Sequence, residues 1–104
     1  MRKITREAAQ AMKSGINYSN SNTVVHSDGG VMDLHGNTIA IFDGDSKLTL
    51  RDSGWRSNTT KERLNGLLYT FSSEWRIYQL KGKWYITDGM GKQEDWKGFK
   101  VFDV

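Results

Sequence analysis

The stretch TVVHSDGGVMDLHGNTIAIFDGDSKLTLR, residues 23–51, sets the fold class of this chain. Four short runs rich in β-branched and other apolar residues are separated there by Asp-Gly-Gly, His-Gly-Asn and Asp-Gly-Asp. Short runs divided by such turn formers are typical of antiparallel strands joined by tight hairpins. We therefore predict a meander of about four antiparallel strands, at residues 23–27, 31–34, 38–42 and 47–51.

The last two of these strands predict which side of the sheet is buried. Leu48 and Leu50 alternate with polar residues, which indicates one buried and one solvent-facing side. In the strand before them we expect Ile39 and Ile41 to share the buried side.

A short helix is predicted on the N-terminal side of the meander. Residues 6–14 are rich in good helix formers, Thr5 precedes them as a possible cap, and Gly15 follows as a left-handed stop. A helix this short is marginal alone, so its apolar face is expected to pack on the sheet.

A second helix is predicted after the meander. Thr59 and Glu62 form a capping-box pattern, which places the cap at Thr59. Leucines at positions 64, 67 and 68 supply an apolar stripe. Gly66 lies inside this pattern, where it either permits close packing or ends the helix early.

The remaining segments complete the predicted architecture. Residues 75–80 and 83–87 form a hairpin pattern around Lys-Gly, residues 99–104 add a possible edge strand, and residues 17–22 and 88–98 are expected to be loops. The whole chain, residues 1–104, is thus predicted to be a single α+β domain. Its parts are a short N-terminal helix, an antiparallel β-meander, a second helix and a C-terminal β-hairpin that joins or extends the sheet.

Composition limits the classes of function. The chain has 104 residues, no cysteine, and no apolar run of about 18–20 residues that a membrane span needs. The absence of cysteine excludes disulfides, thiol catalysis and thiolate metal ligands. Its first residues lack the apolar run of a signal peptide, so we expect a cytoplasmic protein with no membrane partner. The oligomeric state stays open.

The candidate residues for catalysis or metal binding are few. Asp33 and His35 alternate to the same side of one predicted strand, and His26 is placed to pair across the sheet with it. No third metal ligand is fixed, and no phosphate loop, dinucleotide fingerprint or nucleophile elbow occurs. We therefore expect no enzyme activity, no cofactor and no metal, with an enzyme acting at these three residues as a minor alternative.

The stronger signal is a set of aromatic residues interleaved with cations. The net charge is +3, and residues 51–85 carry seven of the fifteen lysines and arginines against three acidic residues. Alternation in the hairpin would place Arg76, Tyr78 and Tyr85 on one face, with two lysines at the tip. The candidate binding residues are Trp55, Arg56, Lys61, Arg63, Arg76, Tyr78, Lys81, Lys83 and Tyr85.

Three kinds of surface fit this set of residues. Tyrosine, tryptophan and arginine are the usual anchors of a protein-binding surface. Cations beside aromatic rings also grip phosphates and stack bases. Cross-strand tyrosine and arginine pairs stabilise ordinary solvent-facing sheets as well, and a lysine at a hairpin tip prevents edge aggregation.

Several motifs occur together and in one order. They are ITREA at residues 4–8, LHGNTIA at 34–40, GW at 54–55 with NTTKERLN at 58–65, and IYQ at 77–79 with WY at 84–85. In this order and at these spacings they resemble a family of small proteins encoded by tailed bacteriophages. The resemblance covers residues 4–86, implies a phage origin, and assigns neither an activity nor a site residue.

A phage origin shapes the functional expectation. Small non-structural phage proteins commonly act by binding a host macromolecule, and that expectation rests on analogy. We expect a non-enzymatic accessory protein in the host cytoplasm, binding a host protein to modulate host metabolism or defence. The alternative is a nucleic-acid-binding module with a basic and aromatic sheet face, and a structural role in the virion is a further, minor possibility.

Overall fold

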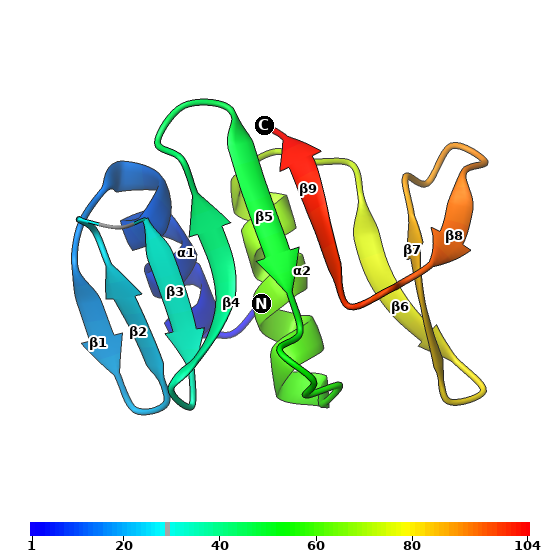
Figure 1. The fold of residues 1–104 in the computed structure, drawn as a ribbon, viewed down its shortest axis with the longest axis horizontal. Helices are drawn as coiled ribbons and strands as arrows, with labels where there is room; N and C mark the ends of the chain where they lie inside the picture. Colours follow the sequence, from blue (N-terminus) through cyan, green and yellow to red (C-terminus); the bar gives the residue numbers. More distant parts are fainter. Residues whose placement is uncertain (29) are drawn as a thin grey trace.

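A computed structural model describes residues 1–28 and 30–104 (Figure 1). Two helices and nine strands follow one another along this part of the chain. In chain order they are α1 Lys3–Ser14, β1 Tyr18–Asn20, β2 Thr23–His26, β3 Val31–Leu34, β4 Asn37–Phe42, β5 Lys47–Arg51, α2 Asn58–Thr70, β6 Arg76–Leu80, β7 Lys83–Thr87, β8 Gln93–Asp95 and β9 Phe99–Asp103. The turn predicted between β2 and β3 includes Gly29, which lies outside the described residues.

The strands form two antiparallel sheets. The larger has the order β1-β2-β3-β4-β5-β9, and the smaller has the order β6-β7-β8. The predicted α+β class, the four-strand meander and the edge position of the last strand are confirmed. The prediction that the C-terminal hairpin joins or extends this sheet is wrong: β9 occupies the edge beside β5, and the hairpin pairs with β8 in a separate sheet.

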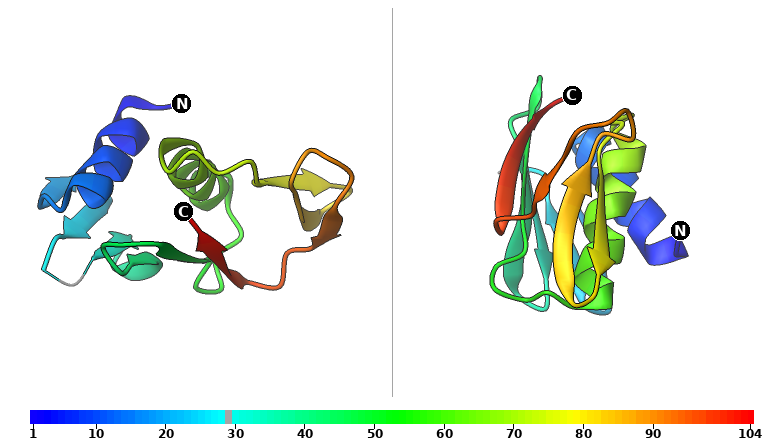
Figure 2. Two further views of the ribbon diagram at one scale, coloured as in Figure 1. Left: turned by 90° about the horizontal axis from the view of Figure 1, so that it is seen from above. Right: turned by 90° about the vertical axis from the view of Figure 1, so that its right-hand side faces the viewer.

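Both helices lie on the same face of the six-stranded sheet, and the three-stranded sheet stands beside α2 (Figure 2). The core between these layers joins α1, α2, both sheets and Trp96. Leu48, Leu50, Leu64, Leu67 and Leu68 are each fully buried in it, which confirms the predicted apolar sides of β5 and α2.

The prediction that Ile39 and Ile41 share the buried side is wrong. The pairing of β3 with β4 shifts register between Met32 and Asp33, so β4 carries one extra residue there. Such a bulge turns consecutive residues to the same side of a strand. Ile39 and Ala40 are both buried as a result, whereas Ile41 is 38% exposed on the opposite face.

Two segments predicted as loops contain strands. Residues 18–20 form β1, paired with β2, and residues 93–95 form β8, paired with β7. Trp96 follows β8 directly and is only 2% exposed. The polar and glycine-rich composition of these segments hid their pairing, because edge strands need little apolar sequence of their own.

Both predicted N-caps are displaced by two residues or more. The N-cap of α1 is Arg2, and Thr5 lies buried inside the first turn. The N-cap of α2 is Ser57, whose hydroxyl accepts a hydrogen bond from the backbone N–H of Thr60. The predicted left-handed residue Gly15 does end α1, with φ at 69°.

A buried arginine explains why Thr5 and Glu62 are not caps. Arg63 is 2% exposed, and its Nη1 donates to the Thr5 hydroxyl at 2.7 Å and to Glu62 Oε1 at 2.6 Å. Its Nε donates to the Thr23 hydroxyl on β2 at 3.1 Å. The Thr5 hydroxyl in turn donates to Glu62. We call these four residues the Arg63 cluster; it joins α1, α2 and β2.

Gly66 permits the close approach of the two helices at the same place. A Cβ built on Gly66 would overlap the Thr5 Cγ2 atom, although the Met1 sulfur would remain at 3.5 Å. The helix nevertheless continues through Gly66 to Thr70. Of the two predicted roles of this glycine, close packing is therefore confirmed.

This contact makes a stability prediction. Gly66→Ala should lower the free energy of unfolding, because overpacking costs about 1–3 kcal/mol and exceeds the gain of about 1 kcal/mol in helix propensity. The Thr5→Ser, Gly66→Ala double variant should recover stability relative to Gly66→Ala, since serine keeps the hydroxyl and lacks Cγ2. Urea unfolding of the two single variants and the double variant measures this. Equal destabilisation by Gly66→Ala in both backgrounds would show that Thr5 is not the obstacle.

The Arg63 cluster makes a prediction about pH. Desolvation raises the pKa of Glu62, but hydrogen bonds from Thr5, the Arg2 backbone and Arg63 outweigh it, so this pKa lies below its ordinary value of 4.5. A depressed folded-state pKa stabilises the protein above pH 4.5, and this contribution is lost as the pH falls through the folded-state value. Glu62→Gln should therefore flatten the acid side of the stability curve. The same change at exposed Glu74 serves as control, and an equal flattening there would contradict the assignment.

Candidate functional site

The outer face of the three-stranded sheet gathers tyrosines and cations. Tyr78 and Tyr85 lie opposite each other on β6 and β7, and their rings stack with centroids 5.5 Å apart and planes at 27°. The face also holds the cross-strand pair Leu80 and Lys83, and Leu80 is 56% exposed. We call the β6–β7 part of this surface, formed by Arg76, Tyr78, Leu80, Lys83, Tyr85 and Thr87, the tyrosine face. On β8 the same side carries Gln93, which accepts a hydrogen bond from the Tyr78 hydroxyl, and Asp95 opposite Tyr85.

The alternation predicted for the hairpin is confirmed. Ile77, Trp84 and Ile86 are 1–3% exposed and point into the core, so their strand neighbours must point the other way. The turn between the strands consists of Lys81 and Gly82, both at positive φ, of 53° and 79°. This is the geometry of a two-residue hairpin turn, and it leaves Lys81 exposed at the tip.

Arg76 is held in place at the far end of the tyrosine face. Its Nη1 donates to the backbone oxygens of Ser73 at 2.7 Å and Trp75 at 2.6 Å. Its guanidinium carbon also lies 5.9 Å from the ring centroid of Tyr69 on α2. These contacts hold the guanidinium of Arg76 in one position between the three-stranded sheet and α2.

Arg56 belongs to a second structural cluster and not to the tyrosine face. The buried carboxylate of Asp52 accepts hydrogen bonds from Arg56 Nε at 3.2 Å and from Trp96 Nε1 at 2.9 Å. The Arg56 Nη2 donates to the Trp96 carbonyl at 3.1 Å. This arrangement ties the loop before α2 to the segment after β8. The neighbouring Trp55 is 64% exposed.

Arg63 and Lys61 also lie away from the tyrosine face. Arg63 is buried in its cluster, so the sequence prediction that it is a surface binding residue is wrong. Lys61 Nζ lies 5.8 Å from the ring centroid of Trp84, on the core side of the sheet, and 3.4 Å from Gln79 Oε1. The structure therefore divides the nine predicted residues, and it leaves five of them, at positions 76, 78, 81, 83 and 85, on or beside the tyrosine face.

The candidate catalytic residues only partly converge. His26 Nε2 lies 3.2 Å from Asp33 Oδ2 across β2 and β3, as predicted. His35 has a positive φ of 51° in the β3–β4 turn, and its ring contacts Asn22 Nδ2 at 3.5 Å instead. Within residues 1–28 and 30–104, no group of three or more histidines and acidic residues is placed to hold a metal ion.

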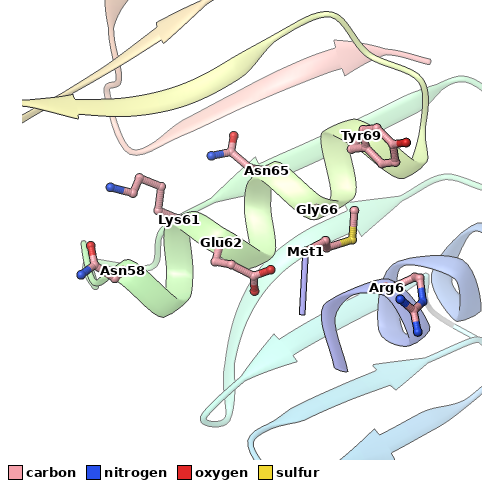
Figure 3. A pocket seen from close by; sticks show the side chains of 8 residues that line it. All are labelled: Met1, Arg6, Asn58, Lys61, Glu62, Asn65, Gly66 and Tyr69. Atoms are coloured by element: carbon pink, nitrogen blue, oxygen red, sulfur yellow. The ribbon is translucent and has the colours of Figure 1, made fainter. Parts of the chain in front are cut away.

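A groove runs along the exposed side of α2, with a volume of about 690 Å³ (Figure 3). Its lining comes from α2 and from the start of the chain, and we call it the α2 groove. The lining residues are Met1, Arg6, Asn58, Lys61, Glu62, Asn65, Gly66 and Tyr69. Figure 3 shows Asn58 and Lys61 at one end of the groove, Tyr69 at the other, and Met1 between α2 and α1.

Asn65 connects this groove to the tyrosine face. Its side-chain Nδ2 donates to the Ile77 carbonyl at 2.8 Å, and its Oδ1 accepts from the Ile77 N–H at 2.8 Å. The amide thus satisfies the outward backbone groups of Ile77 on edge strand β6, as a neighbouring strand would. The three-stranded sheet is thereby fixed against α2.

Sequence reasoning missed several of these residues. Trp96 and Asn65 give no local signal, because the partners of their side chains, Asp52 and Ile77, lie 44 and 12 positions away in the chain. Asp52 and Arg56 are only four positions apart, so their pairing was open to prediction from the spacing. Tyr69 could have been found, since it follows the leucine stripe of α2 on the opposite face of the helix.

Neither helix of the described chain is long and apolar enough to span a membrane.

Comparisons with known proteins give one match. No curated protein and no solved structure matches the chain. The family model of the Kyanoviridae Gp96 protein, a phage family, matches residues 1–102, in agreement with the resemblance found in the sequence. Because this match covers nearly the whole chain, the protein belongs to the Kyanoviridae Gp96 family of phage proteins.

Proposed function

We propose that this phage protein binds a protein of the infected host cell through the tyrosine face, and that binding modulates host metabolism or defence. The observation that carries the proposal is the stacked pair of Tyr78 and Tyr85 on the outer face of a sheet whose inner face is core. Stacking restrains both rings before binding, so little side-chain entropy remains to be lost. Tyrosine and arginine are among the residues enriched in binding hot spots.

The placement of the cations supports a protein partner over a nucleic acid. A nucleic-acid site needs several cations free to contact phosphates. Arg63 is buried against Glu62, and Arg56 is paired with Asp52, so both have partners within the chain. Leu80, 56% exposed, instead adds apolar area beside the tyrosines. Lys81 and Lys83 keep the nucleic-acid alternative open, and the experiment below tests it.

Site-specific photo-cross-linking tests this proposal. A benzoylphenylalanine residue at position 80 should give a discrete protein adduct in host-cell lysate, and the adduct should survive nuclease treatment. The same residue at position 49, on the opposite side of the six-stranded sheet from the helices, serves as control and should not give that adduct. In the Tyr78→Ala, Tyr85→Ala background the adduct should fall at least tenfold, since the two anchors together contribute about 1.4 kcal/mol or more.

A matched variant separates loss of binding from loss of folding. The Tyr78→Phe, Tyr85→Phe protein keeps both rings and should keep most of the adduct, while far-ultraviolet circular dichroism and thermal unfolding confirm that every variant is folded. An adduct that disappears on nuclease treatment would replace this proposal with the nucleic-acid alternative. An unchanged adduct in the folded double-alanine variant would exclude the tyrosine face as the binding surface.

A further inference from the structure

The α2 groove meets the tyrosine face at Tyr69, where the Arg76 guanidinium lies over the ring at 5.9 Å. We propose that the α2 groove binds an acidic, extended peptide segment. The inference rests on the proposed function in one respect, namely that the partner docked on the tyrosine face supplies this segment. Binding of an acidic peptide to the groove is measurable without that partner.

The charges around the groove are complementary to an acidic segment. Arg6 and Lys61 line it, the Lys61 ammonium lying against Trp84 and Gln79 near the Asn58 end. Arg76, which is outside the lining, lies over the Tyr69 ring at the other end. Glu62 also lines the groove, but its carboxylate already accepts hydrogen bonds from Thr5, Arg63 and the Arg2 backbone. Since the buried Arg63 compensates the charge of Glu62, the cations set the sign of the field along the groove.

The dimensions of the groove suit an extended chain. From Asn58 to Tyr69 the helix rises about 16 Å, which is the length of about five residues in extended conformation. Gly66 lies in the lining, where Thr5 and the Met1 sulfur cover it, so the peptide would contact the Met1 side chain there. Tyr69 and Met1, which are 65% and 56% exposed, offer apolar contact area along the way.

The aromatic content of the groove favours a peptide over a nucleic-acid strand. Single-stranded nucleic acid is held by successive bases stacked on aromatic ring faces. Tyr69 is the aromatic residue of the groove lining, and Arg76 lies over its ring. An acidic side chain, in contrast, pairs directly with the guanidinium groups of Arg6 and Arg76.

An NMR titration tests this inference. An acetylated deca-glutamate peptide, added to ¹⁵N-labelled protein at low salt, should shift the amide signals of Arg6, Lys61, Gly66 and Tyr69. Raising the salt from about 20 to 200 mM should weaken binding at least severalfold, because exposed charges are screened. The Arg6→Gln, Lys61→Gln variant should bind at least tenfold more weakly. Lys92→Gln, Lys97→Gln removes the same charge away from the groove and should bind like the unaltered protein.

Several results would overturn the inference. They are an absence of shifts with millimolar peptide, shifts that map outside the groove, or equal weakening by the two double variants. Tighter binding of a ten-nucleotide oligothymidylate to the same residues would assign the groove to nucleic acid instead. Each of these outcomes leaves the cross-link from position 80 unaffected, so failure of the groove inference is distinguishable from failure of the proposed function.

Discussion

The packing of the two helices on the sheet depends on the buried guanidinium of Arg63. It donates hydrogen bonds to Thr5 of α1, Glu62 of α2 and Thr23 of β2. Three elements that are distant in the chain therefore contact the same buried guanidinium. A buried charge with several hydrogen-bond partners is costly to leave unpaired, which makes this arrangement of the helices specific. Gly66 lies one turn further along α2 and permits the same close approach. The position of α2 in turn places the α2 groove and the two hydrogen bonds from the Asn65 side chain to the Ile77 backbone on β6.

Local patterns in the sequence predicted most of the elements, and they failed wherever a distant partner decided the outcome. Turn residues and alternation located the meander and the hairpin, because both depend on neighbours in the chain. Thr59 and Glu62 match a capping box by spacing, yet Glu62 is used by Arg63 and Thr5. The bulge at Ile39 reversed the expected side of Ile41, since one extra residue exchanges the two faces of a strand.

The same distinction applies to the candidate site. The tyrosine face was predictable, because it follows from period-two alternation within one hairpin. Arg56 and Arg63 resembled surface cations in sequence, but Asp52 and Glu62 bind them within the fold. The exposed positive charge is consequently smaller than the composition indicates. Lys81 and Lys83 stay exposed at the end of the hairpin beside the stacked tyrosines. On these grounds we propose a protein partner with an acidic segment in preference to a phosphate backbone.

Burial of Arg63 in the core underlies both the packing of α2 and the preference for a protein partner over a nucleic acid. The exchange of its Nε proton with water measures this burial directly. By ¹⁵N NMR, the Arg63 Nε–H should exchange much more slowly than the same group of exposed Arg51, because it is buried and donates to Thr23. Its signal should also stay unchanged when oligonucleotide is added. Rapid exchange, or a shift on adding oligonucleotide, would place Arg63 at the surface and contradict both the packing described for α2 and the preference for a protein partner.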